Sequence, residues 1–191
     1  MITLAEVARA LQGCWRLARL DPAGMDFFDK TTTGFWRSFW VAFLVAPAYF
    51  LLRSYDVGET EIIVHPARHV AAEMIAYVII WVAYPLALFY LTRLMDKTAG
   101  YVAYIVAYNW SHILQFAFFL PILALMPDNP ASPLAWGLFI MAANLVVFIY
   151  VGYIAKTALG ITAMMAAGVV ALDVALMHLI GGIRDAILIS G

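Results

Sequence analysis

Long apolar segments alternate with short polar ones along the chain, and five apolar segments dominate the pattern. They cover residues 34–52, 70–91, 99–126, 134–155 and 159–182. A helix needs about 20 apolar residues to cross about 30 Å of hydrocarbon, so each segment predicts one transmembrane helix. Pro47, Pro85 and Pro121 stand inside the first three segments, where neighbouring helices can satisfy the freed backbone groups. The pattern predicts an all-α polytopic membrane protein with five transmembrane helices.

Residues 3–20 have a different pattern, with the period of an amphipathic helix. Apolar residues such as Leu4, Leu11 and Trp15 recur at steps of three and four, and the charged residues fall opposite them. We expect this helix to lie at the membrane interface with its arginines toward anionic headgroups. Packing against the cytosolic ends of the bundle is the alternative. Pro22 ends the helix, because proline cannot continue the backbone hydrogen bonding.

The basic residues predict how the chain is oriented. With the N-terminus inside, eight of the eleven fall on the inner side: Arg9, Arg16, Arg19, Lys30, Arg37, Arg93, Lys97 and Lys156. Arg53, Arg68 and Arg184 fall on the outer side. The positive-inside rule then predicts an N-terminus on the cytoplasmic side and a C-terminus on the outer side of the membrane. The expected organisation is a cytoplasmic helix and connector at 1–33, a transmembrane domain at 34–182 and a short tail at 183–191.

Composition narrows the function classes. Apolar residues make up 65% of the chain and charged residues 12%, against about a quarter charged in soluble domains. The net charge of -1 argues against a nucleic-acid partner, which requires a basic surface. A single cysteine, Cys14, excludes an internal disulfide and a cysteine-rich metal site. The sequence also lacks the common catalytic motifs, so we expect neither an enzyme nor a cofactor.

Polar residues inside the last three apolar segments form the main candidate site. At comparable predicted depths lie Asn109, His112, Gln115, Asn144 and Asp173. An unpartnered charge at such depth costs about 3 kcal/mol or more, so Asp173 should be protonated, hydrogen-bonded or paired with His112. Such a cluster could relay protons or ions, or could clamp helices together with about 0.6 kcal/mol per hydrogen bond. We favour the clamp, because one Asp and one His make a sparse pathway.

A stripe of polar and aromatic residues runs along the third apolar segment. It comprises Tyr101, Tyr104, Tyr108, Ser111 and Gln115, at steps of three and four. Such a stripe is more typical of helix packing with satisfied hydroxyl groups than of a cofactor site.

A ridge of small residues marks the last apolar segment. Ala163, Ala167, Ala171 and Ala175 repeat every four residues and therefore share one helix face. Small side chains allow a second helix to approach closely. This alanine ridge predicts a helix contact, either within the chain or with another subunit.

Two histidines and a glutamate precede or enter the second apolar segment. His65, His69 and Glu73 stand four residues apart and could share a helix face. This spacing allows a metal site. The alternative is an ordinary polar cap at the outer interface, which we favour.

The chain resembles the Yip1-like membrane proteins, in particular their small alphaproteobacterial-type members. The resemblance rests on FWRSFWVAFLVAPAYFLL at 35–52, YIVAYNWSHILQ at 104–115 and AKTALG at 155–160, and would cover residues 30–182. It implies a polytopic inner-membrane protein without a catalytic site. Eukaryotic members are linked to small GTPases through a longer cytosolic N-terminal region, which a lead-in of about 33 residues does not match.

These observations favour a non-enzymatic scaffold or accessory subunit, with the lipid bilayer and a membrane-protein partner or a second copy as its partners. The alternative is a small transporter or proton-coupled permease that uses Asp173, His112 and Asn109. A membrane enzyme at His65, His69 and Glu73 is the third hypothesis.

Overall fold

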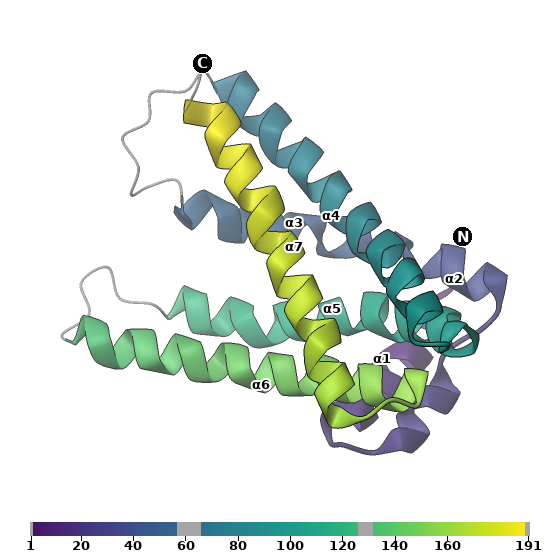
Figure 1. Ribbon diagram of the computed structural model, residues 1–191. Helices are drawn as coiled ribbons and strands as arrows, with labels where there is room; N and C mark the ends of the chain where they lie inside the picture. The colour runs from purple at the N-terminus through teal and green to yellow at the C-terminus, as the bar shows by residue number, and fades with distance from the viewer. Residues whose placement is uncertain (1, 57–65, 126–131, 190–191) are drawn as a thin grey trace.

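The computed structural model describes residues 2–56, 66–125 and 132–189, and in these ranges the chain is helical without strands (Figure 1). The short leading elements are α1 (Leu4–Ala18), η1 (Pro22–Phe27) and α2 (Thr32–Ser38). The longer helices and one short turn are α3 (Trp40–Asp56), α4 (Pro66–Leu94), η3 (Thr98–Gly100), α5 (Tyr101–Ala124), α6 (Pro133–Leu159) and α7 (Ala163–Ile189). Among the described residues, five stretches are long and apolar enough to cross a membrane. The predicted all-α polytopic fold is confirmed.

Several predicted boundaries shift. The last helix does not begin at Leu159, which instead ends α6, because Gly160 adopts a left-handed conformation with φ of 60° and closes the helix. The expected tail at 183–191 is helical through Ile189, as part of α7. The first span is interrupted at Phe39, between α2 and α3.

Helix α5 is the centre of the molecule. In Figure 1, α5 and α6 run side by side, while α4 and α7 form a second pair that crosses them obliquely. Helix α3 packs on α5 as well. Every residue from Tyr104 to Ser111 is buried, which makes this part of α5 the core around which the other helices are arranged.

Helix α1 packs against the bundle. It contacts α5 and α6, and the Tyr150 hydroxyl of α6 donates to the Cys14 carbonyl oxygen at 3.2 Å, while Gly13 lies against η1. The structure therefore shows the bundle-packed arrangement, which had been the alternative to the interfacial one. Trp15 and Leu20 remain exposed at 57% and 55%, so apolar side chains of this region still face outward. Burial raises the pKa of the Cys14 thiol to about 12, because the thiolate loses its hydration there.

The connector to the first span is held by local hydrogen bonds. The Asp29 carboxylate accepts from the Thr31 hydroxyl at 2.7 Å and from its backbone N–H at 3.1 Å, and these bonds lower the pKa of Asp29. Thr31 in turn caps α2 by accepting from the Gly34 N–H at 3.1 Å. Arg37 of α2 pairs with Glu6 of α1 at 3.2 Å. These contacts fix α1 relative to the first span.

Candidate functional site

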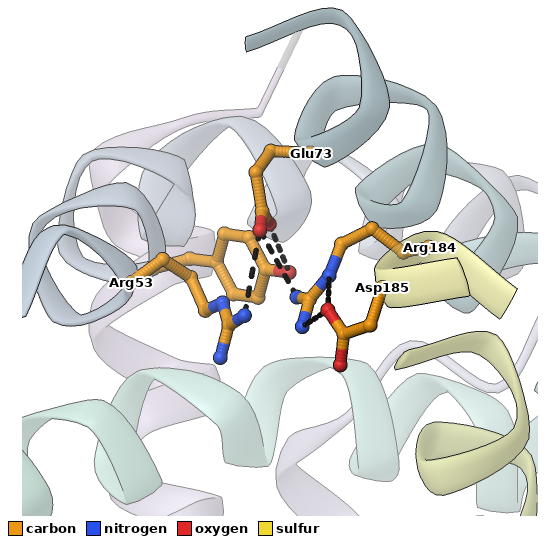
Figure 2. A network of polar contacts seen from close by, with 5 residues as sticks. Arg53, Glu73, Arg184 and Asp185 are labelled. Carbon is orange, nitrogen blue, oxygen red and sulfur yellow. Dashed lines mark hydrogen bonds and ion pairs between the residues drawn. The ribbon is translucent and has the colours of Figure 1, made fainter. Parts of the chain in front are cut away.

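A group of charged contacts lies between α3, α4 and α7, at the ends that the charge rule places outside. Glu73 of α4 is only 3% exposed, and its Oε1 lies 3.4 Å from Arg53 Nη2 of α3 and 3.0 Å from Arg184 Nη1 of α7 (Figure 2). The Tyr49 hydroxyl of α3 donates to Glu73 Oε2 at 3.4 Å. One buried carboxylate therefore joins three transmembrane helices.

Arg184 has a second acidic partner on its own helix. Its Nε and Nη2 donate to Asp185 Oδ1 at 2.9 and 2.7 Å. The Arg184 side chain is 10% exposed and that of Asp185 is 56% exposed, so Asp185 connects the buried charges to the surface. A buried carboxylate that loses its cationic partners is strongly destabilised, so this outer ion network has a structural role in holding α3, α4 and α7 together.

A second polar contact lies deeper, between α5 and α7. The Tyr108 hydroxyl donates to Asp173 Oδ2 at 2.8 Å. The Tyr108 ring also packs edge-on against His112, with 4.7 Å between ring centroids. Asp173 is thus hydrogen-bonded to a tyrosine hydroxyl, and the same tyrosine contacts His112, the other expected partner of Asp173.

The other members of the predicted intramembrane cluster bond separately. Asn109 is fully buried, and its amide donates to Ser38 Oγ of α2 at 2.8 Å. The His112 Nδ1 atom lies 3.0 Å from the Tyr108 carbonyl oxygen of the preceding turn. Gln115 donates to Ser111 Oγ at 2.9 Å, and Asn144 donates to a carbonyl oxygen of its own helix at 2.8 Å. The structure brings Asn109, His112 and Gln115 onto α5 near one another, whereas Asn144 bonds within α6 and Asp173 reaches α5 through Tyr108.

A small cavity lies beside this deeper group. It has a volume of about 80 Å³, and its lining includes Tyr49, Trp81, Tyr108, Asn109 and His112. That volume is enough for about two water molecules, since each occupies about 30 Å³ in the liquid. The Asn109 Oδ1 atom is buried without a hydrogen-bond donor among the described residues. The cavity is mainly apolar, and Asn109 contributes both to its lining and to the unsatisfied acceptors of the described residues.

The predicted metal residues are only partly described. His65 lies outside the described residues, whereas His69 and Glu73 both belong to α4. The Glu73 carboxylate is occupied by Arg53 and Arg184. Over the ranges that the structure describes, no three His, Cys, Asp or Glu side chains form a group suited to a metal ion.

The alanine ridge of α7 lies open. Ala163, Ala167, Ala171 and Ala175 are all exposed, and no described helix of the chain covers them. Helix α7 buries other residues instead, among them Ala166 and Val169. Next to the first half of the ridge, α6 and α7 border a groove of about 460 Å³ whose lining includes Gly152, Ala163 and Ala167. The ridge is therefore not a contact between helices of this chain.

Two parts of this arrangement were missed by the sequence analysis. Tyr108 had been assigned to packing, although its hydroxyl is the partner of Asp173. Arg53 and Arg184 had been used only to infer orientation, although both pair with Glu73. A signal was available in the sequence. Glu73 and Arg184 carry opposite charges, and both lie near the predicted outer ends of their spans, where a charge requires a partner.

No family model, curated protein or solved structure matches this chain. The resemblance to Yip1-like proteins therefore stays a prediction, and the function is argued from the structure itself.

Proposed function

We propose that this protein is a non-enzymatic scaffold or accessory subunit that presents the alanine ridge of α7 to another transmembrane helix. The partner helix belongs to a second membrane protein or to a second copy of this chain. The observation that carries the proposal is the exposure of all four alanines on one face of a span. Close helix approach in a bilayer depends on such small residues, because dispersion contacts and backbone proximity replace the hydrophobic effect there.

The burial of the spans supports this role. In the apolar stretch of α7, only 17% of the residues are buried within the chain. The corresponding share for the stretch that contains α5 is 39%. Helix α5 forms the interior, whereas α7 offers most of its surface to its surroundings. The groove between α6 and α7 adds a recess beside the ridge, into which larger side chains of a partner helix fit.

The polar contacts inside the bundle also support a structural role. Glu73 is joined to two arginines, Asp173 to Tyr108, and Asn109 to Ser38, each through a contact between different helices. These bonds fix the relative positions of α2, α3, α4, α5 and α7. A rigid bundle is what a scaffold needs in order to present one face in a constant geometry.

The proposed location is the bacterial inner membrane, with the N-terminus in the cytoplasm and the C-terminus in the periplasm. The bias of basic residues supports this orientation. Fusing a fluorescent protein and alkaline phosphatase to each terminus in turn tests it. Fluorescence at the N-terminus and phosphatase activity at the C-terminus are expected, and the reverse pattern would overturn the orientation.

The ridge is tested by filling it. Leucine side chains at two exposed positions, in the double variant A167L/A171L, should block close approach without disturbing the chain's own packing. The mass of the particle extracted in native lipid should fall to that of the single chain. The control is A142L, which adds the same bulk at an exposed position of α6 and should leave the assembly intact. A wild-type particle that already has the mass of one chain would contradict the proposal.

A second function, proton-coupled or ion-coupled transport, is favoured by one observation. Asn109 lines the cavity beside Tyr108 and His112, and its buried Oδ1 atom has no hydrogen-bond donor among the described residues. Asp173 is bonded to the same Tyr108. The variant D173N separates the two functions: loss of flux or growth with normal membrane levels supports transport, whereas unchanged flux with reduced thermal stability supports the clamp.

A further inference from the structure

A groove lies between α4 and α7 on the end of the bundle that carries the outer ion network. Its volume is about 290 Å³. Apolar side chains from both helices line it, chiefly Ala72, Ile75, Ile79, Ile180, Ile183 and Ile187. Two arginines, Arg68 and Arg184, complete the lining. The groove thus combines an apolar floor with guanidinium groups.

The two arginines differ in what they offer to a ligand. The Arg184 charge is compensated by Glu73 and Asp185. Arg68 donates through Nη2 to the Ile187 carbonyl oxygen, which uses one of the five N–H donors of its guanidinium. Within the described ranges no carboxylate pairs with Arg68. Among these residues, its positive charge is therefore uncompensated at the mouth of an apolar groove.

The dimensions of the groove match one leaflet of a bilayer. From Arg68 to Ile79 the helix advances about 16 Å at 1.5 Å per residue, and half of the hydrocarbon core is about 15 Å thick. When the apolar end of the groove reaches the bilayer centre, Arg68 stands at the depth of the headgroups. An arginine at that depth meets lipid phosphates.

We propose that this groove binds an anionic phospholipid from the leaflet in which α4 begins. The lipid phosphodiester accepts hydrogen bonds from the Arg68 guanidinium, and one acyl chain lies along the isoleucines of α4 and α7. Charge complementarity favours a headgroup with net negative charge, such as that of phosphatidylglycerol. A transmembrane helix is a poorer occupant, because its apolar side chains offer no negative charge to Arg68.

Native mass spectrometry of the purified full chain tests the proposal, with phosphatidylglycerol and phosphatidylcholine titrated separately. Wild-type protein should retain one phosphatidylglycerol at least fivefold more strongly than phosphatidylcholine. The variant R68Q should lose this preference. The matched control is R93Q, which removes the same charge from the opposite end of α4, and it should keep the preference. Equal retention by wild type and R68Q, or an equal loss in R68Q and R93Q, would overturn the proposal.

The apolar part of the groove is tested by filling it. In A71F, a phenylalanine replaces an exposed alanine of the lining, and retention of phosphatidylglycerol should fall at least threefold although both arginines remain. V82F is the control, because Val82 is exposed on the same helix outside the groove lining. Unchanged retention in A71F would exclude an acyl chain in the groove. Circular dichroism thermal scans of all four variants verify that each is folded before binding is compared.

Discussion

The Tyr108 hydroxyl donates a hydrogen bond to Asp173 Oδ2 at 2.8 Å, and this contact connects the central helix α5 to the last span, α7. It gives the half-buried carboxylate of α7 a hydrogen-bond donor. Tyr108 also contacts the His112 ring. We interpret the Tyr108–Asp173 bond as an interhelical clamp between α5 and α7.

Removing the Tyr108 hydroxyl should weaken this clamp. In Y108F the Asp173 carboxylate loses its donor, and the free energy of unfolding should fall by about 1 kcal/mol, near the middle of the range for interhelical hydrogen bonds in membranes. The measurement is reversible unfolding in mixed micelles. The control Y90F removes the hydroxyl of an exposed tyrosine on α4 and should have no effect. Equal stability of Y108F and Y90F would contradict the clamp.

Truncating Glu73 should be more costly than truncating an exposed acid. The variant E73A leaves two guanidinium groups beside an emptied buried site, and the expected loss is about 3 kcal/mol. Asp26 pairs with Lys30 at 3.5 Å but its side chain is 78% exposed, so D26N should have no measurable effect. Thermal scans of both variants in lipid particles provide the comparison. Similar melting temperatures would show that the outer ion network does not stabilise the bundle.

Gly100 lets the start of α5 approach the end of α6. A Cβ atom at this position would lie 2.5 Å from the Ala158 carbonyl oxygen. Real Cβ atoms essentially never make a contact this short. We expect G100A to lower the melting temperature by several degrees, because the two backbones must separate. G137A should leave it unchanged or raise it, since nothing lies within 4 Å of a Cβ there and alanine favours the helix.

Cys14 should be almost inert toward thiol reagents at neutral pH. Only the thiolate reacts with such reagents. Burial raises the pKa of this thiol from 9.0 to about 12, so the thiolate forms at a pH about three units higher than in an unfolded chain. Maleimide labelling at pH 7 should be negligible in the folded protein and complete after denaturation. Labelling at the rate of free cysteine in the folded state would show that α1 detaches from α5.

The sequence was sufficient for the spans but not for the contacts between them. Five apolar stretches of about 20 residues have few alternatives to transmembrane helices, so the fold class followed directly. The partners of Glu73 depend on which helices are neighbours, and the pattern of apolar and polar residues within one helix does not predict its neighbours. Arg53 and Arg184 were therefore counted for orientation although they lie on either side of the same carboxylate.

The boundary errors have local causes. Apolar character continues through Leu159 and Ile161, so hydropathy does not mark the turn that Gly160 makes with positive φ. Helix α7 likewise continues through Arg184 and Asp185, because their mutual contact and the pairing with Glu73 keep charged residues within the helix. The alanine ridge, in contrast, was recognised from spacing alone, since a four-residue repeat places its members on one face whatever the helix packs against.

The most direct measurement is site-specific photo-crosslinking on the alanine ridge in native membranes. A small diazirine-bearing amino acid placed at Ala171 should give one discrete crosslinked product with a second protein chain, whose mass distinguishes another copy from a different partner. The same residue placed at Ala142, exposed on α6, should give lipid adducts alone. If the probe at Ala171 also reacts only with lipid, the ridge is a lipid-facing surface and the proposed scaffold role is wrong.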